Sequence, residues 1–238
     1  MSSKPTLPAV VFEITGACNL RCRHCYNVWH GSVGGTRPSS PSYRLAKKTL
    51  KRLFRVAEVG RITMSGGEPL LVERLPELVL FCRLRHKTVS VVTSGHAGTE
   101  ETYRDLLEAG AGVFQLPVHS ADPSVHDAMT GVAGSWNAAR RSIEQLRSLG
   151  GRVSAVIVMT QLNHQGLRDT LRHIAELGVR EVLLNRCIVG GRGLTDWQEL
   201  VLEAVHLRAA FAVADDEVAK SGLTITSNVS TPPVSYTH

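Results

Sequence analysis

The chain has 238 residues, of which 43% are hydrophobic and 20% charged, as in an ordinary globular protein with one sizeable core. No apolar run approaches the roughly 18 residues of a membrane-spanning helix, and the N-terminal segment MSSKPTLPAV lacks the apolar core of a secretory signal, so we expect a cytoplasmic protein with no membrane partner. The 27 basic and 21 acidic residues give a net charge of +6, but there is no run of five basic residues and there are few aromatic residues, which disfavours a nucleic-acid partner.

Strand-like and helix-like patterns alternate along the chain. Continuous apolar runs predict strands at 8–14, 61–64, 88–94, 113–118, 152–160 and 181–185. Apolar residues at helical spacing predict helices at 43–58, 75–82, 99–109, 135–149, 166–177 and 195–214. A loop with several glycines and prolines covers 28–42, and a last apolar stretch lies at 223–226.

This alternation amounts to six units in which a strand precedes a helix. Such a pattern requires parallel strands joined by right-handed crossovers, so the fold class is α/β. Six units are too few for a closed eight-stranded barrel, which leaves an open partial barrel or a doubly wound sheet. In both architectures ligands bind at the carboxyl ends of the strands.

Three cysteines follow the first predicted strand in the stretch ITGACNLRCRHCYNVW. Cys18, Cys22 and Cys25 have the spacing C-x3-C-x2-C, and thiolates on short spacings are ligands for zinc or for an iron–sulfur cluster. Three thiolates can hold three irons of a [4Fe–4S] cluster and leave the fourth iron open. Zinc is the alternative, but structural zinc sites use two ligand pairs, and His24 inside the spacer would be strained as a fourth ligand. Cys82 lies on the apolar face of a predicted helix and is expected in the core.

A second motif, Gly66-Gly67-Glu68-Pro69, ends the second predicted strand. The two glycines allow the backbone to approach a ligand closely, and the proline favours an extended Glu68. Bare carbonyls beside a carboxylate would suit a ligand ammonium group. An ordinary turn between a strand and a helix explains the same residues equally well.

Together the two motifs resemble the radical SAM superfamily, whose signature is C-x3-C-x2-C followed one strand later by GGEP. The resemblance implies an open partial TIM barrel, (β/α)6, that uses a [4Fe–4S] cluster and S-adenosylmethionine (SAM). It implies that Cys18, Cys22 and Cys25 bind the cluster. It further implies SAM contacts for Gly66, Gly67, Glu68, Pro69, Thr93, Ser94 and Ser120, those of the first four with the amino group and those of Thr93 and Ser94 with the ribose.

A glycine-rich loop after the sixth strand resembles one found in peptide- and cofactor-maturing members, many of which carry a cysteine-rich extension called SPASM or Twitch. By this resemblance Asn185 and Arg186 belong to the cofactor site, and Cys187 is a candidate hydrogen-atom donor, although a core position is favoured for it. No cysteine follows Cys187. We therefore expect a radical SAM core over 1–222 and a short tail over 223–238, where an extension would begin.

The resemblance implies an enzyme that reductively cleaves SAM to a 5′-deoxyadenosyl radical, which abstracts hydrogen from a peptide or cofactor precursor. Maturation of a ribosomally made peptide is the favoured task. Tetrapyrrole modification, activation of a glycyl radical enzyme, and a shortened non-catalytic protein that binds a cluster or a peptide are the alternatives. An electron donor such as flavodoxin or ferredoxin is the second expected partner. The residues do not identify the substrate.

Overall fold

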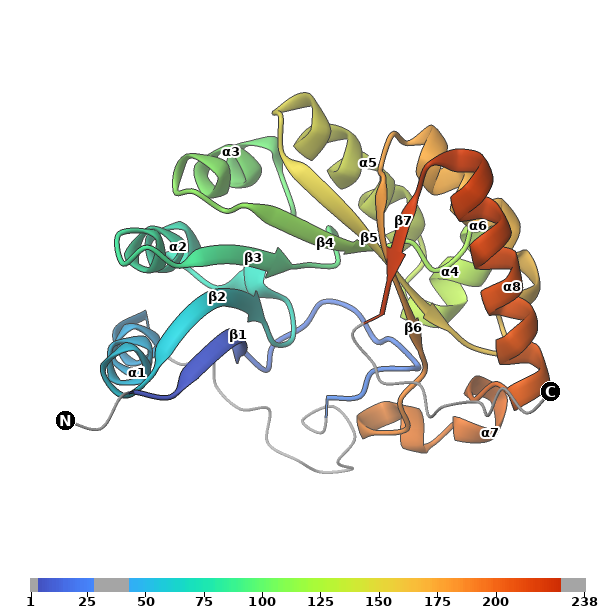
Figure 1. Ribbon diagram of the computed structural model, residues 1–238, viewed down its shortest axis with the longest axis horizontal. Helices are drawn as coiled ribbons and strands as arrows, with labels where there is room; N and C mark the ends of the chain where they lie inside the picture. The colour runs from blue at the N-terminus through green and yellow to red at the C-terminus, as the bar shows by residue number, and fades with distance from the viewer. Residues whose placement is uncertain (1–3, 28–42, 228–238) are drawn as a thin grey trace.

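A computed structural model describes residues 4–27 and 43–227 of the protein, and Figure 1 shows the chain as a ribbon. The described strands form one parallel sheet in the order β1-β2-β3-β4-β5-β6-β7, so each strand pairs with its neighbours in sequence. The strands are β1 (Thr6–Glu13), β2 (Glu58–Ser65), β3 (Thr88–Val92), β4 (Val113–Pro117), β5 (Arg152–Met159), β6 (Glu181–Arg186) and β7 (Thr224–Thr226).

The sheet is curled into a half-barrel with helices along its outer side (Figure 1). The helices are α1 (Tyr43–Val56), α2 (Leu75–Arg83), α3 (Glu100–Glu108), α4 (Pro123–Thr130), α5 (Ser135–Ser148), α6 (Leu167–Glu176), α7 (Trp197–Leu200) and α8 (Ala204–Ser221). The core is formed where the strands meet these helices and includes fully buried residues such as Leu78, Leu106, Ile143 and Leu171. The prediction of an α/β partial TIM barrel with parallel strands is confirmed.

The structure adds one strand that the sequence reading left as an apolar stretch. Strand β7 pairs in parallel with β6, with Val182 opposite Ile225, and forms one edge of the seven-stranded sheet. The boundary predicted between 222 and 223 stays a prediction, and the loop predicted at 28–42 lies outside the described residues. In the described part of the chain, no helix is long and apolar enough to cross a membrane.

The helix predicted at 195–214 is wrong in its extent. Its first part is the short α7, and α8 begins only at Ala204, because Val201 and Glu203 have extended backbone angles. Contacts from elsewhere fix this break: Leu200 is fully buried, and the Gln161 side chain donates hydrogen bonds to the carbonyls of Gln198 and Val201. No local signal in the sequence marks these contacts.

Helix α4 also departs from the sequence reading, which treated its residues as a loop. Asp122 accepts a hydrogen bond from the backbone N–H of Ser124, and Pro123 occupies the first helical position. An aspartate cap followed by proline is a common helix start, so this helix had a signal in the sequence.

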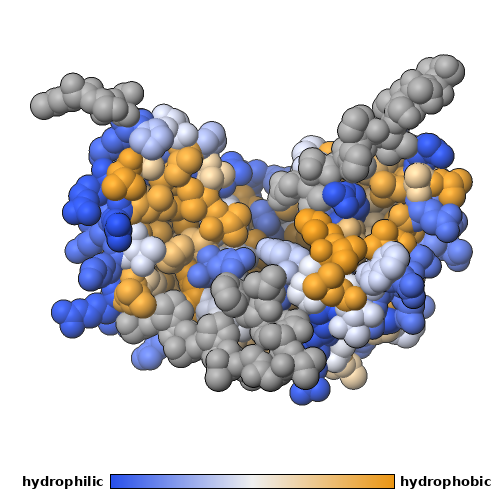
Figure 2. All heavy atoms as spheres, turned by 90° about the horizontal axis from the view of Figure 1, so that it is seen from below, coloured by the Kyte–Doolittle hydropathy of each residue, from blue (hydrophilic) through white to orange (hydrophobic). Residues whose placement is uncertain are grey.

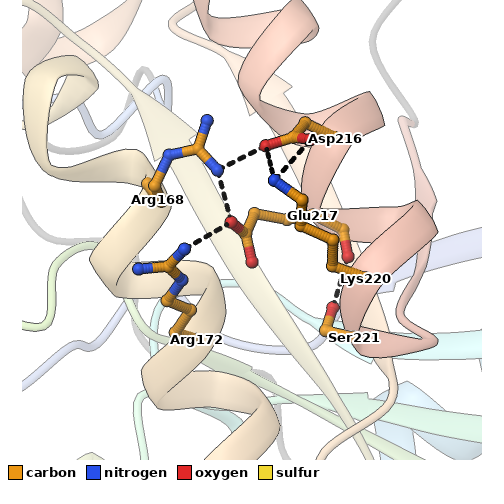
Figure 3. A network of polar contacts seen from close by, with 6 residues as sticks. All are labelled: Arg168, Arg172, Asp216, Glu217, Lys220 and Ser221. Atoms are coloured by element: carbon orange, nitrogen blue, oxygen red, sulfur yellow. Dashed lines mark hydrogen bonds and ion pairs between the residues drawn. The ribbon is translucent and has the colours of Figure 1, made fainter.

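A network of ion pairs joins α8 to α6 (Figure 3). Glu217 is buried in α8 and contacts Arg168 at 2.5 Å and Arg172 at 3.2 Å. Asp216 contacts the same Arg168 and also Lys220. Since α8 leads directly into β7, this network holds the last described helix and strand against the rest of the barrel.

Candidate active site

The cysteine loop, residues 14–27, follows β1 and is tied to the GGEP turn by backbone hydrogen bonds. The N–H of Gly67 donates to the carbonyl of Thr15 at 2.6 Å, and the N–H of Glu68 donates to the carbonyl of Ala17 at 2.7 Å. These bonds place the two motifs side by side at the carboxyl ends of β1 and β2.

The sequence suggested that Gly66 and Gly67 allow the backbone to approach a ligand, but in the structure a segment of the protein occupies the space beside them. A Cβ on Gly67 would lie 2.1 Å from the carbonyl oxygen of Ala17, and one on Gly66 would lie 2.4 Å from that of Thr15. Gly66 also has a positive φ of 130°. The close approach that these glycines permit is therefore made by the cysteine loop itself.

Two further segments hold the cysteine loop. At the end of α4, the carbonyls of Thr130 and Met129 accept hydrogen bonds from the N–H groups of Arg21 and Arg23, both at 2.9 Å. The loop after β6 approaches from the other side of the half-barrel, where the N–H of Arg192 donates to the carbonyl of Cys25 at 3.0 Å.

Side chains reinforce the last of these contacts. Arg23 forms ion pairs with Asp196 at 2.9 Å and with Glu199 at 2.5 Å. The cysteine loop thus connects the carboxyl ends of β1 and β2, in one half of the half-barrel, with the loop after β6 in the other half.

A cavity of about 250 Å³ opens beside the cysteine loop. It contains nine of the residues predicted for the cluster or for SAM: Cys18, Cys22, Cys25, Gly66, Gly67, Thr93, Ser94, Asn185 and Arg186. These residues come from the ends of β1, β2, β3 and β6, so the fold gathers distant parts of the sequence around one space.

Glu68 is turned away from this cavity and is 1% exposed. Its carboxylate accepts hydrogen bonds from Thr93 Oγ1 at 2.7 Å, from the N–H of Ser94 at 2.7 Å and from Ser94 Oγ at 2.5 Å. The N–H of Leu70 donates a fourth bond. Glu68 therefore joins the GGEP turn to the Thr93-Ser94-Gly95 turn, and its predicted contact with SAM stays a prediction.

The three cysteine thiols are free and partly buried in the cavity wall. Burial raises the pKa of Cys18 and Cys25 and raises that of Cys22 to about 12, with a further contribution from the neighbouring cysteines to Cys18 and Cys22. A bound metal reverses this effect, because a coordinating thiol is deprotonated. Three thiols facing one cavity provide a donor set that fits an iron–sulfur cluster.

Among the described residues, no group of three or more His, Cys, Asp or Glu side chains is placed to hold a single metal ion. A single ion requires its ligands to converge within about 2.3 Å of one point. In a cluster each thiolate binds a different iron, so the thiols can lie farther apart.

A row of three imidazoles extends from the cavity into the protein. The ring of His24 contacts that of His119 edge-on, with centroids 4.6 Å apart, and His119 stacks on His126 at 5.4 Å. Burial lowers the pKa of His24 and of His126 to about 4, and lowers that of His119 well below its ordinary value. The row is therefore neutral at pH 7.

Other predicted site residues lie outside the cavity lining. Pro69 is buried in the turn after β2, and Ser120 is buried with its hydroxyl accepting a hydrogen bond from the N–H of Asp122. Cys187 is 5% exposed, its N–H donates to the carbonyl of Met159, and burial raises the pKa of its thiol. The roles predicted for these residues stay predictions.

The cavity also contains residues that the sequence reading did not select. Gln115, Val156 and Val158 line it from the concave side of β4 and β5, and Ile188 lines it from the loop after β6. Gln115, Val156 and Val158 are less buried than their neighbours in β4 and in the second half of β5, because they face the cavity. Seen from below, exposed apolar residues gather in two areas of the surface (Figure 2). Tyr26 and Ile188 are exposed apolar side chains that line the cavity.

The comparison with known families now defines the class of protein. The sequence profile of the radical SAM superfamily matches residues 12–174, which is more than half of the chain. The protein belongs to the radical SAM superfamily.

Individual relatives resemble this chain over most of its length. A pre-heme d1 synthase of Dinoroseobacter shibae is 27% identical over 186 residues, covering 78% of this chain and 45% of the relative. The mycofactocin maturase MftC of Mycobacterium ulcerans is 29% identical over 221 residues, covering 92% of this chain and 57% of the relative.

A solved structure has the same fold. Streptococcus suis SuiB bound to its precursor peptide SuiA superposes with a TM-score of 0.77 at 13% identity, over 95% of this chain and 49% of SuiB. At this identity the likeness concerns the fold alone. The chain spans about half the length of the relatives and of this structure.

Proposed function

We propose that the protein is a radical SAM enzyme that reductively cleaves SAM at a [4Fe–4S] cluster and uses the resulting 5′-deoxyadenosyl radical to abstract hydrogen from a peptide. Cys18, Cys22 and Cys25 would hold the cluster, which supplies the electron for cleavage when it is bound. The observation that carries this proposal is the shared cavity, in which the three thiols face the ends of β2, β3 and β6.

The chain's own residues would bind and shield the cofactor. Gly66 and Gly67 form the cavity wall beside the cysteines, and Thr93 and Ser94 are held there by the buried carboxylate of Glu68. The apolar wall formed by Val156 and Val158 would limit the access of water to a reactive radical. These residues act by orientation and exclusion and need not exchange a proton.

A peptide is the favoured substrate class because one relative, the PqqA peptide cyclase of Xanthomonas campestris, and one structure with the same fold have a peptide in their names. MftC is named a maturase and SuiB was solved with a precursor peptide. The pre-heme d1 synthase supports the second candidate, modification of a tetrapyrrole.

Anaerobic reconstitution with iron and sulfide tests the proposal. We expect about four irons per chain, a [4Fe–4S] spectrum, and 5′-deoxyadenosine after reduction with dithionite in the presence of SAM. Serine substitution of Cys18, Cys22 or Cys25 should abolish the spectrum. The control Cys82→Ala should keep the spectrum, because Cys82 lies on the buried face of α2 and does not line the cavity.

Two outcomes would contradict the proposal. Zinc bound in place of iron would contradict the cofactor assignment. An intact cluster that never cleaves SAM would contradict the enzymatic function and favour a binding protein.

A further inference from the structure

Helix α1 carries an unusual concentration of positive charge. Its 14 residues, YRLAKKTLKRLFRV, include six lysines and arginines and no acidic residue. Six is also the net charge of the whole chain. The basic residues are separated by apolar ones at helical spacing, so a search for consecutive basic residues does not detect the cluster.

Five of these six cations form one exposed face, the α1 basic face. Its members are Arg44, Lys48, Lys51, Arg52 and Arg55, all exposed to solvent. Within residues 4–27 and 43–227, none of the five has a carboxylate at ion-pair distance. The sixth, Lys47, lies over the rings of Tyr43 and Phe81.

The apolar side of α1 is already used by the fold. Ala46 and Leu50 are buried, and Leu53 and Phe54 are packed against the core. Leu45 and Val56 are the large apolar side chains of α1 that remain exposed, so the outer surface of the helix is mainly charged and suits a partner recognised by its charge.

The start of α1 lies at the same end of the half-barrel as the cysteine loop. The guanidinium of Arg74 lies 4.0 Å from the ring centroid of Tyr43, the first residue of α1. Arg74 follows the GGEP turn, which is bonded to the cysteine loop. Glu77, the acidic residue beside this first turn, is paired with Arg74, so among the described residues it does not form an ion pair with the α1 basic face.

We propose that the α1 basic face is the docking surface for an acidic one-electron donor protein. This inference rests on the proposed function, because cleavage of SAM requires an electron from outside the chain. Encounters between redox proteins bury small interfaces and are steered by complementary charge. A row of exposed cations that have no ion-pair partner among the described residues has that character.

The alternatives are an anionic membrane and a nucleic acid. An interfacial helix inserts its apolar face into the membrane, and here that face packs against the core. Binding of single-stranded nucleic acid uses aromatic stacking platforms, and both aromatic residues of α1, Tyr43 and Phe54, pack against the core. Both alternatives are outcomes of the test below.

The test compares two variants that lose the same charge. Arg52→Gln/Arg55→Gln removes two cations from the α1 basic face, and Arg141→Gln/Arg208→Gln removes two exposed arginines from α5 and α8. Each reconstituted protein is supplied either with reduced flavodoxin, as the acidic donor, or with dithionite. Production of 5′-deoxyadenosine is measured at limiting donor, and binding of oxidised flavodoxin is titrated separately.

At about 50 mM salt we expect the α1 variant to lose roughly tenfold in the flavodoxin-dependent rate and in flavodoxin affinity. The loss should shrink at high salt, because screening weakens exposed charges. The control variant should stay within about twofold of wild type, and neither should change with dithionite.

Equal losses in both variants would overturn the proposal, since they would reflect net charge alone. An unchanged α1 variant would also overturn it, as would α1-dependent binding of anionic vesicles or single-stranded RNA with no effect on flavodoxin. If dithionite yields no 5′-deoxyadenosine in any protein, the proposed function fails, and the flavodoxin titration still decides the docking surface.

Discussion

At the scale of single residues, the buried carboxylate of Glu68 connects two turns of the candidate site. Four hydrogen bonds reach it from Leu70, Thr93 and Ser94. An ionised carboxylate is acceptor-only and can satisfy all four donors. Glu68 thereby fixes the relative position of two turns whose residues line the cavity.

Substitution of Glu68 tests this role. In Glu68→Gln the new amide group brings donors toward Ser94 and leaves at least one buried donor unsatisfied. We expect the free energy of unfolding to fall by about 1–3 kcal/mol in urea titration. The control Glu101→Gln, at an exposed glutamate of α3, should change it by less than about 0.5 kcal/mol. Equal effects of the two variants would contradict the positioning role.

Gly67 provides a second prediction at this scale. Gly67→Ala would place a Cβ 2.1 Å from the Ala17 carbonyl oxygen, so the cysteine loop must move. We expect the variant to lose most of its iron after reconstitution, measured by iron content and absorbance. Gly166→Ala is the matched control, because its Cβ meets nothing within 4 Å and its φ is not positive. Full iron content in Gly67→Ala would show that the close approach is dispensable.

At the scale of elements, Asp127 connects the end of α4 to the start of α5. Its carboxylate accepts hydrogen bonds from the N–H of Gly134 at 2.6 Å, from Ser135 Oγ at 2.8 Å and from the N–H of Trp136 at 2.8 Å. Asp127 at the end of α4 therefore caps the first turn of α5.

The pH dependence of stability follows from these bonds. Partial burial acts to raise the pKa of Asp127, but the bonds from Trp136, Ser135 and Gly134 outweigh it and lower the pKa below the ordinary value. A lowered pKa stabilises the fold fully above the unfolded value, and this stabilisation is lost as pH falls through the folded pKa.

We therefore expect Asp127→Asn to reduce the free energy of unfolding by about 1 kcal/mol at pH 7. The difference from wild type should shrink below about pH 4. Urea titrations between neutral and acidic pH measure it, with Asp105→Asn on the exposed side of α3 as control. A difference that grows toward low pH would contradict the assignment.

At the scale of the whole molecule, the cysteine loop connects the first strand of the half-barrel to its far side. Arg23 reaches Asp196, a residue 173 positions away in the sequence. The backbone of the loop after β6 meets Cys25 at the same place. An open barrel is thus closed at its carboxyl end by the loop that would hold the cluster.

We expect the loss of the Arg23 ion pairs to make both the cysteine loop and the loop after β6 more mobile. In Arg23→Ala we expect a modest fall in stability of about 0.5–1 kcal/mol, since the pair is partly exposed. The amide hydrogens of Arg192 and Gly193, which donate to Cys25, should exchange faster in hydrogen-exchange measurements. Arg140→Ala, which removes a local pair within α5, should leave that exchange unchanged. Unchanged exchange in Arg23→Ala would show that the backbone contacts hold the loop alone.

The sequence by itself determined the order of the first six strands, the parallel sheet and the residues of the two main motifs. Apolar periodicity and fixed short spacings are local properties, so they can be read without knowing the fold. The break between α7 and α8 could not be read in this way, because it depends on Gln161 and on the burial of Leu200.

Only the tertiary structure decided how these parts meet. The Arg23 ion pairs, the bonds to Glu68 and the cavity residue Gln115 all join segments that are distant in sequence. The sequence shows that α1 is rich in basic residues, but only the structure shows that five of them are exposed and have no ion-pair partner among the described residues. Contacts of this kind form where the curled sheet brings the ends of its strands together. The pattern of residues along the chain carries no information about the distance in space between two such ends.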